Sequence, residues 1–125
     1  MKVLENENLI CFDCDDTLVM WGDPSHPDAI EIIDPNDGSA NYLIPHKFHV
    51  DLLKKHSGRG YSIIVWSQGG YMWALNVIKA LKLEKYVDII ATKPIKYVDD
   101  LVCNEWMGQH LYFKDLKSED KTTKD

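Results

Sequence analysis

Hydrophobic residues along this chain gather in short runs that are separated by polar and glycine-rich stretches. Two of these runs, 9–12 and 61–66, are apolar almost throughout, which is typical of strands buried on both faces of a parallel sheet. Further strands are predicted at 86–91, 95–98 and 110–113. Together these runs predict a mostly parallel sheet.

Two stretches with helical spacing of apolar residues lie between the predicted strands. Pro45 stands at a first-turn position where helices tolerate proline, and Gly58-Arg59-Gly60 ends this helix. A second helix is predicted from about Tyr71 to Leu81. Strands that alternate with helices predict an α/β fold, a three-layer sandwich around a Rossmann-like sheet.

Residues 19–44 interrupt this alternation. The stretch WGDPSHPD contains two prolines and a glycine and is predicted to be a loop. Apolar and β-branched residues flank the turn PNDG at 35–38, which predicts a β-hairpin. An insert of this size holds a loop and a hairpin but no cap domain. We predict one domain, residues 1–116, followed by a polar tail at 117–125.

Composition narrows the class of protein. The chain has 125 residues, 45% of them hydrophobic, which is enough for one domain with a core. Its net charge of -6 disfavours binding along nucleic acid, which needs a basic face. No apolar run approaches the roughly 18 residues of a membrane span, and the first ten residues lack a signal-peptide core. We expect a cytoplasmic, reduced protein, and leave a homo-oligomer open.

Cysteine and histidine pairs each allow a functional and a structural interpretation. Cys11 and Cys14 have the C-x-x-C spacing of a redox pair or half a zinc site. Residues three apart on a strand point to opposite faces, so we expect two small, half-buried strand residues. His46 and His49 share a helix face, but no further zinc ligand at suitable spacing is evident, so we expect a solvated face.

Polar residues stand where three of the predicted strands end. Asp13 and Asp15 follow the first strand, Ser67 follows the second, and Asp99 and Asp100 follow the fourth. Ligands of open α/β sheets bind beyond the carboxyl ends of the strands. If these strands are neighbours, five polar residues meet at one edge of the sheet.

These segments resemble the motifs of the haloacid dehalogenase (HAD) superfamily. ICFDCDDTL is similar to its first motif, an apolar strand followed by Asp-x-Asp-x-Thr. IIVWS resembles the second motif, KYVDD resembles the fourth, and Lys93 in ATKP is the candidate for the lysine of the third. The resemblance covers roughly residues 8–114 and implies a small, capless, HAD-like phosphatase that acts on a phosphomonoester.

The resemblance also implies a role for each matched residue. Asp13 would be the nucleophile that forms an aspartyl-phosphate, and Asp15 the general acid and base. Mg²⁺ would be bound by Asp13, by the backbone carbonyl of Asp15, and by Asp99 or Asp100.

Phosphate binding is implied for Ser67 and the backbone N–H groups beside it. The candidate substrate-binding residues are Thr17, Ser67, Gln68, Gly69 and Trp21, the last as a stacking surface at the mouth. A site without a cap would be open, as in enzymes that act on large substrates or borrow a lid from a partner subunit. The identity of the phosphorylated substrate stays open.

Lys93 poses a geometric problem. It lies six residues before Asp99, a span of roughly 20 Å in extended chain, which places it near the far end of a strand at 95–98. The preceding connection is also too short for a parallel crossover. Either 86–91 is not a regular parallel strand, or Lys93 follows an unusual path, or another cation such as Lys96 replaces it.

Two other functional classes stay open. A phosphoacceptor receiver domain of a signalling system also combines an acid pair, a hydroxyl residue and a Lys-Pro dipeptide. Its phosphorylated Asp should end a middle strand, and the only candidate, Asp34, falls in the predicted hairpin. The other class is a catalytically silent binding module of the same fold, which would have no reason to retain the acids.

Overall fold

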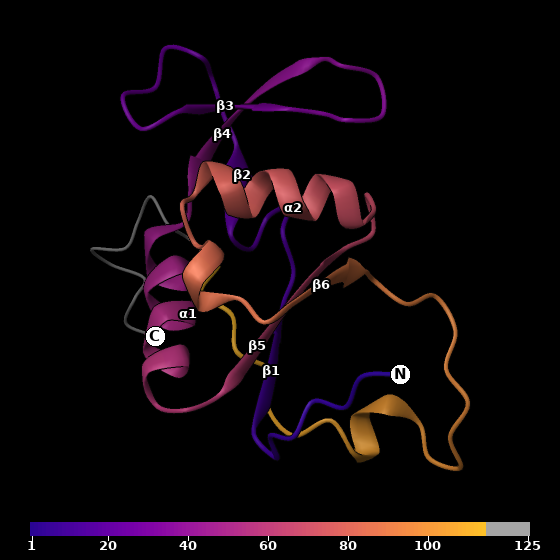
Figure 1. Ribbon diagram of the computed structural model, residues 1–125. Helices are drawn as coiled ribbons and strands as arrows, with labels where there is room; N and C mark the ends of the chain where they lie inside the picture. Colours follow the sequence, from indigo (N-terminus) through magenta and orange to yellow (C-terminus); the bar gives the residue numbers. More distant parts are fainter. Residues whose placement is uncertain (115–125) are drawn as a thin grey trace.

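A computed structural model describes residues 1–114 of the chain (Figure 1). Strands, two α-helices and two one-turn 3₁₀ helices make up the described part. In chain order they are β1 (Leu9–Phe12), β2 (Val19–Trp21), β3 (Ile30–Ile33), β4 (Ala40–Pro45), α1 (Lys47–Gly58), β5 (Ser62–Ser67), α2 (Tyr71–Ala80), η1 (Glu84–Tyr86), β6 (Ile89–Thr92) and η2 (Cys103–Glu105). The tail predicted at 117–125 lies outside the described residues.

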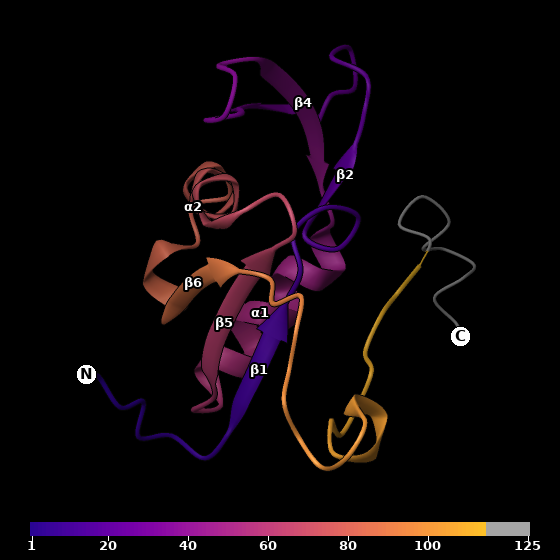
Figure 2. The same ribbon diagram turned by 90° about the vertical axis from the view of Figure 1, so that its right-hand side faces the viewer.

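β1, β5 and β6 form a parallel sheet in the order β1-β5-β6 (Figure 2). Leu9 pairs with Ser62 at one end, and Ser67 pairs with Thr92 at the other. β5 is the middle strand, and Ile63 within it is fully buried, as expected for an apolar run covered on both faces. Because all pairs are parallel, the carboxyl ends of the three strands meet at one edge.

A separate antiparallel sheet, in the order β2-β4-β3, holds the insert. The hairpin predicted around PNDG is confirmed, with Gly38 at a φ of 76° in the turn between β3 and β4. β2 was not predicted, because a three-residue strand gives almost no local signal and its partner β4 begins 19 residues after β2 ends. Figure 1 shows this sheet above α2, and the Asn76 amide joins the two by donating to the Ile33 carbonyl oxygen at 2.8 Å.

The start of α1 differs from the prediction. Pro45 does not open the helix but is the last residue of β4, where it pairs with Val19. His46 caps α1 instead, and its Nδ1 accepts the backbone N–H of His49 at 3.3 Å. Proline is compatible with both a strand end and a first helical turn, so the sequence could not separate them. The end of the helix, at Gly58, is as predicted.

The strands predicted at 95–98 and 110–113 are absent from the described structure, where neither segment is paired in a ladder. Figure 1 shows the chain leaving the sheet after β6 and curving away, and Ile95 and Val98 are 87% and 103% exposed. Four apolar or alternating residues suit a strand, but a strand forms only beside a partner that completes its hydrogen bonds. The apolar pattern carries no information about that partner.

The other predictions hold in their coarser form. α2 spans the predicted helix, and β6 overlaps the strand predicted at 86–91 but begins three residues later and ends one residue later. The fold is α/β, with a three-stranded parallel sheet, two helices and a separate antiparallel sheet. Between β5 and β6 lie only α2 and η1. Within residues 1–114, no helix has both the length and the apolar character that crossing a bilayer requires.

The core draws on both sheets and both α-helices, and Leu53 of α1 is fully buried in it. Leu53→Ala is expected to lower the free energy of unfolding by about 2–5 kcal/mol, because the vacated space cannot close completely. Urea unfolding would measure this. Leu75→Ala on α2 is the control, since Leu75 is 36% exposed, and its expected cost is under about 1 kcal/mol. Equal losses in both variants would contradict this assignment of the core.

Candidate active site

A pocket of about 390 Å³ lies at the carboxyl edge of the parallel sheet. It collects residues from the loops that follow β1 and β5, together with one residue from near the end of the described chain. The lining consists of Asp13, Asp15, Asp16, Thr17, Ser67, Gln68, Gly69 and Tyr112. The strand-end rule therefore predicted where the polar side chains of the first two strands meet.

The loop after β1 is organised around the backbone of Cys14. The Cys14 carbonyl oxygen accepts the N–H groups of Thr17, Leu18 and Val19 at 3.1, 2.9 and 3.2 Å. The Cys14 side chain is fully buried, whereas the acids on either side of it line the pocket. Asp16 has a φ of 63°, in the left-handed region that Asp tolerates better than most residues. This tight turn presents three carboxylates to one cavity.

Cysteine chemistry has no support in this loop. Cys11 and Cys14 are both free thiols. Burial, followed by the neighbouring charges of Asp13 and Asp15, raises the pKa of Cys14 to about 12. A thiol of that pKa stays protonated and is a poor nucleophile and metal ligand. Cys11 is half-buried in β1 as expected, whereas Cys14 is fully buried and lies in the loop after β1, not in a strand.

Asp15 is held by a hydrogen bond from α2. The indole Nε1–H of Trp73 donates to its Oδ1 at 2.7 Å. Burial is the main reason that the pKa of Asp15 is raised; the Trp73 bond lowers it, and Asp13, Asp16 and Asp34 raise it. A carboxyl group with a raised pKa holds a proton more readily, which suits a general acid. The spacing of Trp73 indicated only core packing, so its bond to Asp15 was not predicted.

Trp21 does not line the pocket. Its ring stacks on that of Trp73, with centroids 6.3 Å apart and an interplanar angle of 5°. Trp21 is 53% exposed, so it remains accessible to solvent. Its role in substrate binding stays a prediction.

The loop after β5 is shaped by Ser67. Its hydroxyl oxygen accepts the backbone N–H of Gly69 at 2.9 Å, and the side chain is 2% exposed. A Cβ on Gly69 would lie 3.3 Å from both Ser67 Oγ and Trp73 Cδ1, so the turn has little room for a side chain. Gly70, at a φ of 105°, then leads into α2. Ser67, Gln68 and Gly69 therefore lie where a phosphate group could enter.

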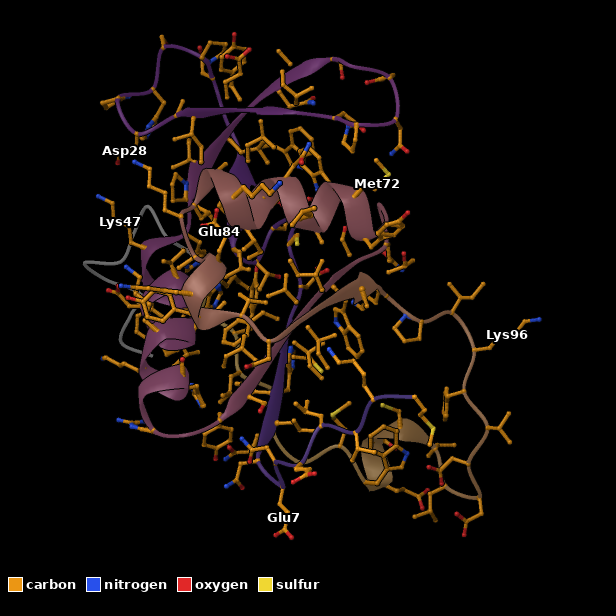
Figure 3. All side chains as sticks on the ribbon, viewed as in Figure 1. Glu7, Asp28, Lys47, Met72, Glu84 and Lys96 are labelled. Carbon is orange, nitrogen blue, oxygen red and sulfur yellow. The ribbon has the colours of Figure 1, made fainter. Side chains whose placement is uncertain are left out.

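The geometric problem of Lys93 disappears in the structure. Thr92 ends β6 opposite Ser67, and the Lys93 N–H donates to the Ser67 carbonyl oxygen at 2.9 Å. None of the three predicted explanations is needed, because β6 is a regular parallel strand and the strand at 95–98 was wrong. The backbone of Lys93 lies at the active edge, although its side chain is not part of the lining. Lys96 points away from the molecule (Figure 3), and its role as a substitute cation stays a prediction.

Asp99 and Asp100 are not brought to the pocket. Both are exposed, and Asp99 Oδ1 accepts the Leu101 N–H at 3.0 Å in a local turn. Across residues 1–114, no three His, Cys, Asp or Glu side chains lie close enough together to hold a metal ion. The structure thus places Asp13 and Asp15 in one pocket, whereas the two acids of the predicted fourth motif lie outside its lining.

Tyr112 is a pocket residue that the sequence did not reveal. Its hydroxyl donates to the Asp16 carbonyl oxygen at 2.7 Å, although the two residues are 96 positions apart. Burial, with smaller contributions from Asp16 and Asp13, raises its pKa. The only sequence signal was the apolar character of HLYF, which was assigned to a strand.

His46 and His49 do not form the solvated helix face that was predicted. They are 0% and 1% exposed, and their rings stack with centroids 3.8 Å apart. His49 Nδ1 lies 2.7 Å from the Thr17 carbonyl oxygen, and His49 Nε2 accepts the Phe113 N–H at 2.9 Å. His46 Nε2 lies 2.8 Å from the Phe113 carbonyl oxygen. The two buried rings therefore join the loop after β1 to the last described residues.

Each ring nitrogen has a defined role in this network. Because His46 Nδ1 and His49 Nε2 accept backbone N–H groups, they carry no proton. The other nitrogen of each ring faces a carbonyl oxygen and must donate. Both histidines are therefore neutral, each in one tautomer. A second proton on either ring would place an N–H against an N–H.

Acid is expected to destabilise the protein through His49. Its pKa is lowered, chiefly by burial, while the Thr17 carbonyl raises it and His46 lowers it. The unfolded chain then binds more protons below its own histidine pKa of about 6.5, so the free energy of unfolding falls as pH drops below that value. Urea unfolding at about pH 8 and about pH 5.5 measures the loss. Within residues 1–114, the His49 ring contacts the rings of His46, Phe48, Tyr112 and Phe113 and the backbone of Thr17 and Phe113, and none of these partners is an acidic or a Lys or Arg side chain.

His49→Gln is expected to reduce this acid sensitivity, because Gln cannot be protonated. His26→Gln is the control, since His26 lies in an exposed loop and its ring accepts the Asp28 N–H. An equal reduction in the control would contradict the assignment.

Comparison with known families shows the family of this chain. The family model described as NIF, NLI interacting factor-like phosphatase, matches residues 8–124. The chain belongs to the NLI interacting factor-like phosphatase family. No curated protein and no solved structure gave a match.

Membership of this family confirms the resemblance to HAD-like phosphatases. As an NLI interacting factor-like phosphatase, the chain is a phosphoric monoester hydrolase. HAD-like phosphatases generally use Mg²⁺. The pocket described above lies within the matched residues, and both of the acids expected in the first motif line it.

Proposed function

We propose that this NLI interacting factor-like phosphatase hydrolyses a phosphomonoester with Mg²⁺, through an aspartyl-phosphate on Asp13. The observation that supports this most is the shared pocket of Asp13, Asp15 and the Ser67 loop. A nucleophile, an acid held by an indole N–H, and polar groups for phosphate binding are the parts that phosphoryl transfer needs.

In the first step a carboxylate oxygen of Asp13 attacks phosphorus. The bond between phosphorus and the ester oxygen breaks, and Asp15 gives its proton to that oxygen, which leaves as the alcohol. The hydrogen bond from Trp73 fixes the direction of the Asp15 carboxyl group. Ser67, Gln68 and Gly69 bind the phosphate oxygens during transfer.

In the second step water attacks the phosphorus of the aspartyl-phosphate. Asp15, now ionised, takes a proton from that water. The bond between Asp13 and phosphorus breaks, inorganic phosphate leaves, and both acids return to their starting forms. Thr17 contributes by holding the loop, since its N–H and carbonyl oxygen are both hydrogen-bonded.

The donor set at the pocket suits Mg²⁺, because the Asp13 carboxylate and the Asp15 carbonyl are the hard oxygen ligands that this ion prefers. When bound, the ion would neutralise charge between nucleophile and phosphate. We propose Asp99 or Asp100 as the third ligand and Lys93 as a further cation at the phosphate. Either acid would have to move toward the pocket together with the segment that follows Lys93. Ile95 and Val98 of this segment are largely exposed, so few contacts hold it in place.

The antiparallel insert also bears on the receiver-domain alternative. Asp34 lies in the turn after β3, where its N–H donates to Ser39 O at 2.8 Å. A receiver would need it at the end of a middle strand of the parallel sheet. The parallel strands and helices support instead the Rossmann-like, three-layer arrangement that we propose for this fold.

Turnover of a generic aryl phosphate tests the proposed function. Purified protein with Mg²⁺ should release phosphate over many cycles. A receiver domain would take up one phosphoryl group and keep it, and a silent module would do neither. Stoichiometric uptake without turnover, or no reaction with a broad panel of phosphomonoesters, would overturn the proposal.

A further inference from the structure

The walls of the pocket differ sharply in polarity. The loops after β1 and β5 contribute carboxylates, hydroxyls, an amide and a glycine. Among the described residues that line the pocket, Tyr112 is the only one with a large apolar side-chain surface. Its ring is 40% exposed, so it can meet a ligand. The polar loops can hold a phosphoryl group, and Tyr112 forms the remaining wall.

Several contacts fix Tyr112 in this position. Its hydroxyl is bonded to the Asp16 carbonyl oxygen, and the next residue, Phe113, is bonded through both its N–H and its carbonyl oxygen to the stacked histidines. The Phe113 ring also packs on Phe48, with centroids 3.8 Å apart. Tyr112 is thus fixed both by its own hydroxyl and by the contacts of Phe113. A side chain fixed in this way is preorganised, so a ligand that binds to it costs little conformational entropy.

We propose that Tyr112 is a specificity-determining residue whose ring contacts the alcohol part of the substrate. This inference rests on the proposed function, which places the phosphoryl group at the polar loops. The ester oxygen and its substituent then extend toward the open side, past Tyr112. The preferred substrates are phosphomonoesters with an aromatic or flat apolar group close to the phosphate. A second anionic group is disfavoured there because Asp13 and Asp16 are near Tyr112.

Benzyl phosphate and ethyl phosphate test this preference, because both have alkoxide leaving groups and only one has a ring. Tyr112→Ala should lower the ratio of their kcat/KM values about three- to tenfold, through KM for benzyl phosphate. Tyr112→Phe should keep the ratio, since it keeps the ring. Tyr42→Ala, an exposed tyrosine on β4 outside the pocket lining, is the matched control and should also keep it.

A loss that is equal for both substrates in Tyr112→Ala would overturn the proposal, because it would indicate a merely structural role. An unchanged ratio would overturn it as well.

Binding separates this proposal from the proposed function. Benzylphosphonate and ethylphosphonate, which cannot be hydrolysed, would be titrated into wild type and Tyr112→Ala by calorimetry with Mg²⁺ present. Tighter binding of benzylphosphonate that is lost in Tyr112→Ala supports the wall even if no phosphate ester is turned over. If esters are turned over but the two phosphonates show no such difference in binding, the proposed role of Tyr112 is overturned and the proposed function still stands.

Discussion

Asp13→Asn is expected to lower kcat for an aryl phosphate by at least about a thousandfold, to the level of the assay background. The amide keeps the shape of the side chain but has no nucleophilic oxygen of comparable strength. It also removes one negative charge from the predicted metal site. Asp13 is a partly exposed pocket residue, so the variant should fold. Steady-state release of phosphate, with urea unfolding of both proteins, measures the two effects separately.

Asp51→Asn is the matched control for this variant. Asp51 is exposed on α1 and is not part of the pocket lining. Its replacement by Asn removes one negative charge, as Asp13→Asn does. Its kcat should stay within about twofold of wild type. Substantial turnover by Asp13→Asn would rule out Asp13 as the nucleophile, and an equal loss in Asp51→Asn would point to an effect of charge or folding.

Removal of divalent cations is expected to have the second largest effect. Two carboxylates beside a phosphate dianion repel it, so chelated protein should lose at least about 99% of its turnover. Added Mg²⁺ should restore the activity. The rate would be followed with EDTA-treated protein as Mg²⁺ is titrated back. Full activity in the chelated protein would contradict the proposed role of the ion.

The same titration distinguishes the two acids after Lys93. Whichever of Asp99→Asn and Asp100→Asn raises the Mg²⁺ concentration needed for half-maximal rate identifies the third ligand. Asp37→Asn, in the exposed turn of the hairpin, is the control. If neither variant shifts the titration, the segment after Lys93 does not contribute to the ion.

The sequence predicted those parts of the fold that depend on local pattern. The parallel strands, the PNDG hairpin and α2 all have short-range signals, and each overlaps its predicted position, although only β5 is mostly buried and β1 is not. The pocket followed from where β1 and β5 end. The apolar pattern predicted which segments can form strands, but it did not predict which segments pair with each other. For this reason 95–98 and 110–113 were wrongly assigned as strands.

The missed site residues share one property, which is dependence on distant contacts. Tyr112 reaches Asp16 across 96 positions, and His49 reaches Phe113 across 64. Two histidines at helical spacing suggested a solvated face, but contacts with the backbone of Phe113 and Thr17 accompany their burial. Trp73 was correctly placed in the core, yet the direction of its indole N–H could not be known from its spacing.

The most direct measurement is the detection of the covalent intermediate. Wild-type protein with Mg²⁺ and substrate would be quenched in acid during turnover, digested, and analysed by mass spectrometry. We predict one phosphoryl group on Asp13, in a form that hydroxylamine removes, and none in Asp13→Asn. Rapid turnover with the phosphoryl group on Ser67, or on any residue other than Asp13, would contradict the account.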